Sequence, residues 1–233
     1  MLGTFMQERR RALAVALCVS VSPYALAQSN GRLYDPEPPT DSAYVRVIVA
    51  DSGAPVEVQV DGKARIPKLA RQDASDYMVI PEGPHTHTLT LTSAGQPALS
   101  YKLDVVRGKS LTLAFPSLKA DAQPTRFEDK GNTNKLKAVI TAYHLDPKAG
   151  PITVSTADGS AKVFSDLAPG QSASLPVNPI KIDLAAAEGK ATPVKFRLEM
   201  SAGATYSVLL IRSAQGKLQA HTLSNKTERY VGP

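Results

Sequence analysis

The feature that most constrains this chain is a two-residue alternation of apolar and polar side chains, repeated in short runs. Val45, Val47 and Val49 alternate in the first run, and VEVQV at 56–60 repeats the pattern. Successive side chains of a β-strand point to opposite faces, so such runs predict strands with one buried face. The runs are separated by turn-forming residues among the 18 Pro and 15 Gly of the chain. The chain is therefore predicted to be all-β, with antiparallel strands.

The order of predicted elements in the first half of the chain recurs in the second half. Each half has a long first strand, a strand ending in Asp-Gly, a Pro-Gly loop, and a late hairpin whose turn contains Gly108 or Gly203. We interpret this as a duplication of one unit of roughly 90 residues, a size within the usual domain range. The fold class predicted is two tandem small antiparallel β-sandwich domains, joined by a short linker and in limited contact. The predicted segments are a signal peptide at 1–27, a Pro-rich N-terminal arm at 28–43, a sandwich at 44–116, a linker at 117–134 and a second sandwich at 135–228.

The first 27 residues have the features of a secretory signal peptide. Three arginines at 9–11 precede an apolar stretch at 12–21, and Ala25-Leu26-Ala27 matches a cleavage pattern. The single cysteine, Cys18, lies within this segment, so the mature chain is expected to have no disulfide and no Cys-ligated metal. We therefore expect export to the periplasm.

The charge of the chain predicts some partner classes and argues against others. Removal of the signal peptide lowers the formal net charge from +6 to +4, with 24 basic and 20 acidic residues remaining. The basic residues alternate with acidic ones and form no patch with interleaved aromatics, so nucleic acid is not an expected partner. A mildly basic exported protein is instead suited to an anionic polysaccharide or an acidic protein.

Serine and histidine residues are present, but in no recognisable catalytic motif. Ser172 lies in Gly-x-Ser-x-Ser rather than in the Gly-x-Ser-x-Gly elbow, and Ser160 follows an Asp-Gly turn. His144 and His221 both fall in predicted strands of the second half. An acetyltransferase or esterase that uses these four residues is one hypothesis. The favoured hypothesis is a binding or scaffolding protein with no catalytic residue and no cofactor.

Two histidines are weak candidates for metal ligands. His85 and His87 are two residues apart on a predicted strand, so both imidazoles would share one face and could approach one ion. No Asp, Glu or Cys lies nearby in sequence as a third ligand. The favoured interpretation is therefore two histidines at a strand entrance, and a metal-binding or carbohydrate-binding sandwich stays an alternative.

The arm before the first strand, LYDPEPP at 33–39, contains two large apolar side chains beside several prolines. Proline fixes φ and so reduces the entropy that the arm loses when it docks, and Leu33 and Tyr34 supply apolar surface. The arm either covers a sheet edge of its own first domain or docks on a partner. For docking on a partner, the candidate residues are Leu33, Tyr34, Pro36, Tyr44 and Arg46.

Arg46 has two predicted roles, both of which place its side chain on the outward face of the first strand. It either pairs with Asp104 across the sheet or meets an acidic partner.

The stretch LYDPEPPTDSAYVRVIVA at 33–50 resembles the start of the AlgF family of alginate biosynthesis proteins. In that family the mature chain opens with Leu-Tyr, a Pro-rich arm and then Ser-Ala-aromatic-Val-Arg-Val. The resemblance implies a periplasmic, non-catalytic adaptor in exopolysaccharide O-acetylation. Its implied partners are a membrane O-acyltransferase and periplasmic SGNH-type acetyltransferases, with the polysaccharide as a further candidate. Similar components occur in cellulose acetylation systems, so the identity of the polymer stays open.

Overall fold

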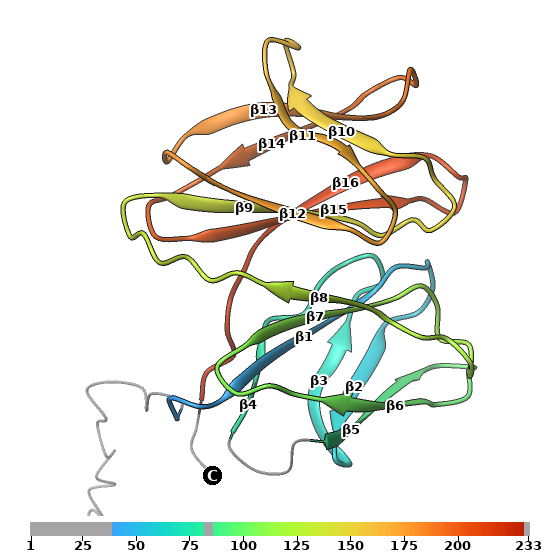
Figure 1. The fold of residues 1–233 in the computed structure, drawn as a ribbon. Coiled ribbons are helices and arrows are strands. Elements are labelled where there is room, and N and C mark those ends of the chain that lie inside the picture. The colour runs from blue at the N-terminus through green and yellow to red at the C-terminus, as the bar shows by residue number, and fades with distance from the viewer. Residues whose placement is uncertain (1–38, 82–85, 231–233) are drawn as a thin grey trace, which may run out of the picture. The chain divides into compact units, whose positions relative to one another are not determined.

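The described part of the chain contains sixteen strands and no helix (Figure 1). The structure is a computed structural model, and it describes residues 39–81 and 86–230. The strands form four sheets of four strands each, which pack in pairs as two tandem sandwiches. The predicted all-β fold with two tandem β-sandwich domains is therefore confirmed.

The first sandwich is built from strands β1 to β8. One sheet has the order β4-β1-β7-β8 and the other has the order β3-β2-β5-β6. The strands are β1 (Ala43–Val49), β2 (Val56–Val60), β3 (Lys63–Leu69), β4 (Met78–Ile80), β5 (Thr86–Ser93), β6 (Leu99–Asp104), β7 (Ser110–Phe115) and β8 (Thr125–Asp129).

The second sandwich repeats this topology with every strand number raised by eight. Its sheets have the orders β12-β9-β15-β16 and β11-β10-β13-β14. The strands are β9 (Ala138–His144), β10 (Ile152–Thr156), β11 (Lys162–Leu167), β12 (Ser172–Val177), β13 (Lys181–Glu188), β14 (Val194–Glu199), β15 (Thr205–Arg212) and β16 (Leu218–Ser224). The matching strand orders are those that a duplicated unit predicts.

The two predicted late hairpins are wrong. β6 pairs with β5 in one sheet, whereas β7 crosses to the other sheet and pairs in parallel with β1. β14 and β15 repeat this crossing, with β15 parallel to β9. At the first crossing, the amide of Gly108 donates to the carbonyl of Ser42 at 3.1 Å, which directs β7 alongside β1. Alternation in sequence identifies the buried face of a strand but leaves its partner strand undetermined, so each sandwich contains one parallel pair that the sequence did not indicate.

Each sandwich encloses its own apolar core between its two sheets. In the first sandwich the alternate valines of β1 and β2 point into this core and are fully buried, as the alternation predicts. A separate core in the second sandwich includes Ile140, Val154, Leu184 and Val208.

The two sandwiches also share apolar surface, which contradicts the expected limited contact. The sheet containing β1, β7 and β8 faces the sheet containing β9 and β15, as Figure 1 shows. A third buried cluster lies between these facing sheets and includes Ile48, Phe127, Tyr143, Leu209 and Ile211. The residues that the structure describes accordingly belong to one compact unit.

The linker predicted at 117–134 is only partly irregular. Strand β8 lies within it and pairs with β7, and Phe127 of this strand is buried against Tyr143 with ring centroids 5.2 Å apart. The sequence did not indicate this strand, because the prolines and polar residues of the segment interrupt the apolar alternation. The irregular connection is therefore shorter than predicted, at 130–137, between β8 and β9.

Two of the predicted segments fall outside the described residues. These are the signal peptide at 1–27 and most of the arm at 28–43. In the part of the chain that the structure describes, no helix is long and apolar enough to cross a membrane.

Candidate functional site at the junction of the sandwiches

The side chains of β1 divide between the core of the first sandwich and the junction with the second. Val45 and Val47 point into the core, so Tyr44, Arg46 and Ile48 point toward the facing sheet. Arg46 is fully buried there. A buried guanidinium is costly unless its donors are satisfied, so its partners define the site.

Arg46 donates hydrogen bonds to four oxygens. Three of these belong to the second sandwich or to the segment that follows β16. Nε donates to Thr112 Oγ1 at 2.7 Å, within the first sandwich. Nη2 donates to Tyr143 Oη at 2.8 Å and to Ser207 Oγ at 3.0 Å, and Nη1 donates to Asn225 Oδ1 at 2.8 Å. Arginine has five N–H donors in a planar fork, so one side chain holds elements from both sandwiches together.

The carboxylate of Asp129, at the end of β8, accepts hydrogen bonds from three hydroxyl groups. Tyr77 Oη donates to Oδ2 at 2.8 Å, Thr112 Oγ1 also donates to Oδ2, and Tyr143 Oη donates to Oδ1. The hydroxyls of Thr112 and Tyr143 thus accept from Arg46 and donate to Asp129. These two hydroxyls couple the buried positive charge to the nearby negative charge.

The two tyrosines of this network are held in their neutral form. Burial raises the pKa of both Tyr77 and Tyr143 well above the usual value, and the nearby Asp129 carboxylate raises it further. The positive charge of Arg46 acts in the opposite direction. Its guanidinium carbon lies 4.7 Å from the ring centroid of Tyr77 and 5.1 Å from that of Tyr143, a cation–π arrangement. The rings therefore pack against the guanidinium while their hydroxyls donate to Asp129.

The segment after β16 returns from the second sandwich to the first. Asn225 Oδ1 accepts from Ser207 Oγ at 2.7 Å as well as from Arg46. Further along, the amide of Tyr77 donates to the carbonyl of Lys226 at 2.8 Å, and the amide of Val79 donates to Glu228 Oε1 at 2.8 Å. Because β4 is the edge strand of its sheet, these bonds satisfy edge groups that would otherwise face solvent.

An open cleft of about 360 Å³ lies beside the buried network. Its walls come from both sandwiches, from the connection at 130–137 and from the segment after β16. Tyr44 is half-buried in the cleft, and Asp129, Tyr77 and Tyr143 line its inner part. The cleft therefore exists only while the sandwiches are held in this arrangement.

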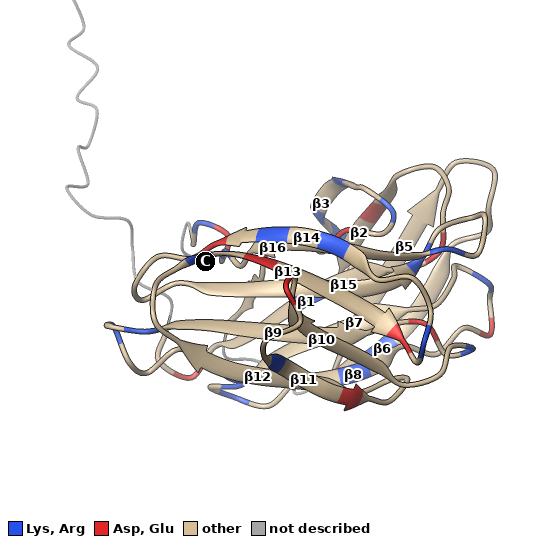
Figure 2. Ribbon diagram, turned by 90° about the horizontal axis from the view of Figure 1, so that it is seen from above, with Lys and Arg blue, Asp and Glu red and all other residues tan. Residues whose placement is uncertain are grey.

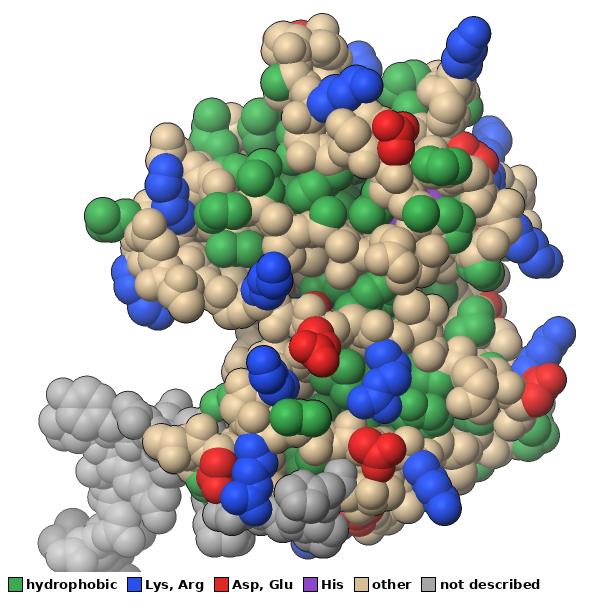
Figure 3. All heavy atoms as spheres, viewed as in Figure 1, with side chains coloured by type: hydrophobic (Ala, Val, Ile, Leu, Met, Phe, Trp, Pro, Cys, Tyr) green, Lys and Arg blue, Asp and Glu red, His purple; other side chains and the backbone are tan. Residues whose placement is uncertain are grey.

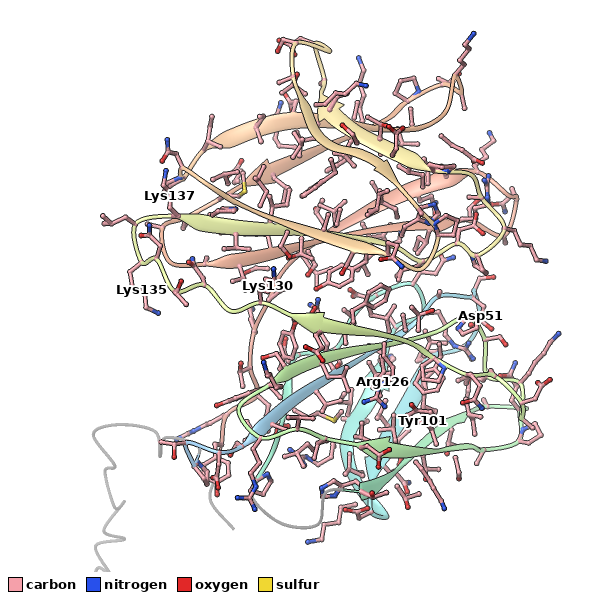
Figure 4. All side chains as sticks on the ribbon, viewed as in Figure 1. Asp51, Tyr101, Arg126, Lys130, Lys135 and Lys137 are labelled. Carbon is pink, nitrogen blue, oxygen red and sulfur yellow. The ribbon has the colours of Figure 1, made fainter. Side chains whose placement is uncertain are left out.

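Lysines form the rim of the cleft. Lys130, Lys135 and Lys226 line it and are exposed, and among the described residues none of the three has an ion-pair partner. Figure 4 labels Lys130, Lys135 and Lys137 on the connection between the sandwiches, and Figure 3 shows basic side chains on the same face. The outer sheet of the second sandwich differs, because it carries both signs of charge (Figure 2) and its cations pair with anions across strands, as Arg197 does with Asp183 and Lys181 with Glu199.

The structure separates the predicted docking residues. Leu33, Tyr34 and Pro36 lie outside the described residues. Tyr44 lines the cleft. The outward, accessible position expected for Arg46 is wrong, because the second sandwich covers that face of β1 and the side chain is fully buried. The expected pairing of Arg46 with Asp104 is wrong for the same reason.

The serines and histidines of the enzyme hypothesis form no hydrogen-bonded pair in the described residues. Ser172 lies one register position from His144, because β12 pairs with β9 at Ser172 and Tyr143. Ser160 Oγ donates to Asp158 Oδ1 at 2.8 Å within its own turn. The rings of His144 and His221 are hydrogen-bonded to backbone carbonyls, at 3.0 Å and 2.9 Å. In the described residues, no hydrogen bond joins a serine hydroxyl to an imidazole.

Only one of the two candidate metal ligands lies in the part of the chain that the structure describes. His87 Nδ1 lies 2.7 Å from Asp61 Oδ2, and its ring is almost fully buried. His85 lies outside the described residues. No group of three or more potential metal ligands occurs in the part of the chain that is described.

Sequence reasoning missed most of the junction. Thr112, Asp129, Tyr143, Ser207 and Asn225 are far apart in sequence and follow no motif. One pattern pointed toward them: the strands AYVRVIV and AVITAYH are apolar on both faces, which is typical of strands covered on both sides.

Fold and junction together define a class of protein: a duplicated β-sandwich with a buried Arg–Tyr–Asp network between its halves. The chain matches the family model described as alginate O-acetyl transferase AlgF over residues 15–201. It is 30% identical over 177 residues to alginate biosynthesis protein AlgF of Pseudomonas aeruginosa, covering 76% of each chain. The protein of the same name from Pseudomonas putida is 29% identical over 77% of each chain. The chain therefore belongs to the AlgF family.

A solved structure is also similar to part of the chain. The C-terminal domain of AlgF from P. aeruginosa is 26% identical and covers 39% of this chain and 100% of that domain, with a TM-score of 0.34.

Proposed function

We propose that this protein is a non-catalytic, periplasmic component of alginate O-acetylation. In this role it links a membrane O-acyltransferase to periplasmic SGNH-type acetyltransferases. Membership of the AlgF family supports the pathway, since the family description names alginate and O-acetyl transfer. The signal-peptide pattern at 1–27 supports export.

One observation carries the non-catalytic part of the proposal. The polar side chains gathered at the junction are committed to holding the sandwiches together, and an acyl-transfer site needs a nucleophile within hydrogen-bond reach of a base. Ser207 Oγ, the buried serine of the site, accepts from Arg46 and donates to Asn225. Its hydroxyl therefore has a cation as its neighbour in place of a base.

The family description itself supplies the competing function, an acetyl transferase. To separate the two, the gene is deleted and replaced by the wild type or by the double variant Ser160→Ala/Ser172→Ala. The acetyl content of the exported polymer is then measured by NMR. We expect deletion to abolish acetylation and both replacements to restore it.

The purified mature protein is tested in parallel on a model acetyl ester. We expect hydrolysis at the rate of buffer alone, together with co-purification of the acetyltransferases of the same system from cells. Turnover that the serine substitutions abolish would establish the enzyme in place of the adaptor.

A further inference from the structure

We infer that the lysine-rimmed cleft at the junction is the docking site for an acidic segment of a partner protein. The inference rests on the proposed function and assigns to it a surface and a chemistry. The cleft is the space of about 360 Å³ lined by Tyr44, Lys130, Lys135 and Lys226 and floored by the buried network.

The charge balance of the cleft favours an anionic occupant. Among the described residues, Asp129 is the one acidic residue that lines the cleft. Its carboxylate already accepts hydrogen bonds from three hydroxyls, two of which also accept from the buried Arg46. Three exposed lysines on the rim therefore face a single acidic side chain, Asp129, among the described lining residues. Complementary charge steers association and fixes register between partners.

The aromatic residues of the cleft favour a protein occupant over a sugar chain. A sugar-binding platform needs exposed ring faces, but Tyr77 is 8% and Tyr143 1% exposed, and the Arg46 guanidinium packs on both rings. Tyr44 alone offers a half-exposed ring. The cleft is thus poor in stacking surface for a sugar.

An exposed apolar side chain lies on the same connection as two of the rim lysines. Leu136 is 80% exposed and stands between Lys135 and Lys137. A single exposed leucine is ordinary on a protein surface, so Leu136 adds an apolar contact to the charged rim and does not by itself define a binding site. An acidic segment that also contains an apolar residue would contact both the lysines and Leu136 of this connection.

The connection at 130–137 is held in shape before any partner arrives. Asn132 Nδ2 donates to the carbonyl of Lys137 at 2.7 Å, and the amide of Leu136 donates to Asn134 Oδ1 at 2.9 Å. Lys137 Nζ donates to Asn178 Oδ1 at 2.6 Å, which ties the connection to the second sandwich. Preorganised side chains bind with a smaller loss of conformational entropy.

The first test places a photo-crosslinking amino acid at Leu136 in cells, with the exposed Lys217, on the connection between β15 and β16, as a control. Crosslinked peptides are identified by mass spectrometry. We expect position 136, and not position 217, to crosslink to an acidic segment of an acetylation protein. A crosslink to a neutral or basic segment, or to no protein at all, would overturn the inference.

The second test compares two triple variants. Lys130→Glu/Lys135→Glu/Lys226→Glu reverses the rim, and Lys102→Glu/Lys190→Glu/Lys217→Glu makes the same charge change elsewhere on exposed lysines. We expect the rim variant to weaken capture of the acetyltransferases by about tenfold or more, and the control variant to change it by less than about twofold.

The outcomes separate this inference from the proposed function. If the rim variant captures the acetyltransferases as well as wild type does, the cleft is excluded and the adaptor function stands. If the wild type captures none of them, the adaptor function fails and the inference fails with it. Retention of an oligouronate that is lost in the rim variant would assign the cleft to the polymer and overturn the protein assignment.

Discussion

Arg46 of the first sandwich donates a hydrogen bond of 2.8 Å to the hydroxyl of Tyr143 in the second, and its guanidinium lies 5.1 Å from the centroid of the same ring. Tyr143 is 1% exposed, so this contact is shielded from water. The tyrosine hydroxyl in turn donates a hydrogen bond to the carboxylate of Asp129. One residue of β9 thus couples the charged groups of β1 and β8, which makes the junction part of the folded core.

The first prediction concerns Arg46 itself. Arg46→Met removes the buried cation and leaves the buried Thr112, Tyr143 and Ser207 hydroxyls without their donor. Each buried polar group left unpaired costs about 1–3 kcal/mol, so we expect a loss of about 3 kcal/mol or more of unfolding free energy. Urea unfolding followed by circular dichroism measures the loss. Arg126→Met is the control, because Arg126 is exposed and donates to Tyr101 Oη at 3.1 Å, so it should cost less than about 1 kcal/mol. Equal losses in the two variants would contradict a special role for Arg46.

The second prediction concerns alkaline pH. The ordinary pKa of tyrosine is 10.0, and burial raises the pKa of Tyr77 and Tyr143 above it in the folded state. The folded chain then binds more protons than the unfolded chain above pH 10. The stability that these groups contribute is fully present below pH 10 and is lost as the pH rises above it.

Two measurements check this pH dependence. Absorbance at 295 nm should show that two tyrosines ionise only as the protein unfolds. The free energy of unfolding should fall more steeply between pH 10 and pH 11.5 in the wild type than in the double variant Tyr77→Phe/Tyr143→Phe. An identical slope in both proteins would show that these tyrosines do not set the alkaline limit.

The fold was more predictable from sequence than the site, for physical reasons that particular residues illustrate. Alternation in VEVQV indicates a strand and its buried face, because side chains repeat every two residues. The same alternation placed Arg46 outward, correctly with respect to its own sheet. It carries no information on what covers that face. The apolar neighbour Ile48 on the same face was the available clue that another layer packs there.

The candidate site depends on contacts that only the folded chain creates. Arg46 and Asn225 are 179 residues apart, and the carboxylate of Asp129 lies in a segment whose prolines and polar residues suggested a linker. Strand pairing has the same limit: the chain crosses between sheets at Gly108 and Gly203, where short glycine turns suggested hairpins. Local patterns therefore indicated most of the strands and the repeat, whereas tertiary packing decided the pairing and burial of those strands.

The third prediction concerns the segment after β16. A chain that ends at Ser224 lacks the acceptors for the amides of Tyr77 and Val79 at the β4 edge. We expect these two amides to exchange with deuterium at least about tenfold faster than in the full chain, because exchange follows local opening. The amide of Tyr44, which donates to the carbonyl of Lys109 at 2.9 Å, serves as the internal control. Unchanged exchange at Tyr77 and Val79 would show that the β4 edge is protected by other means.

The fourth prediction compares two glycines that line the cleft. Gly203 has a φ of +78°, a left-handed conformation that costs a residue with a Cβ about 1–2 kcal/mol, and an added Cβ would lie 3.6 Å from the carbonyl oxygen of Lys135. Gly131 has no positive φ and has nothing within 4 Å of an added Cβ.

These two sites therefore give opposite expectations for the same substitution. Gly203→Ala should lower the unfolding free energy by about 1–2 kcal/mol. Gly131→Ala should leave it unchanged or raise it by up to about 1 kcal/mol, because alanine restricts the unfolded chain. Urea unfolding of both variants measures the difference.

Because the carbonyl of Lys137 accepts from the amide of Gly203 at 2.8 Å, strain at this turn reaches the connection that carries the rim lysines. Gly203→Ala should therefore also weaken partner capture, and full capture by a destabilised Gly203→Ala protein would show that the turn and the rim are uncoupled.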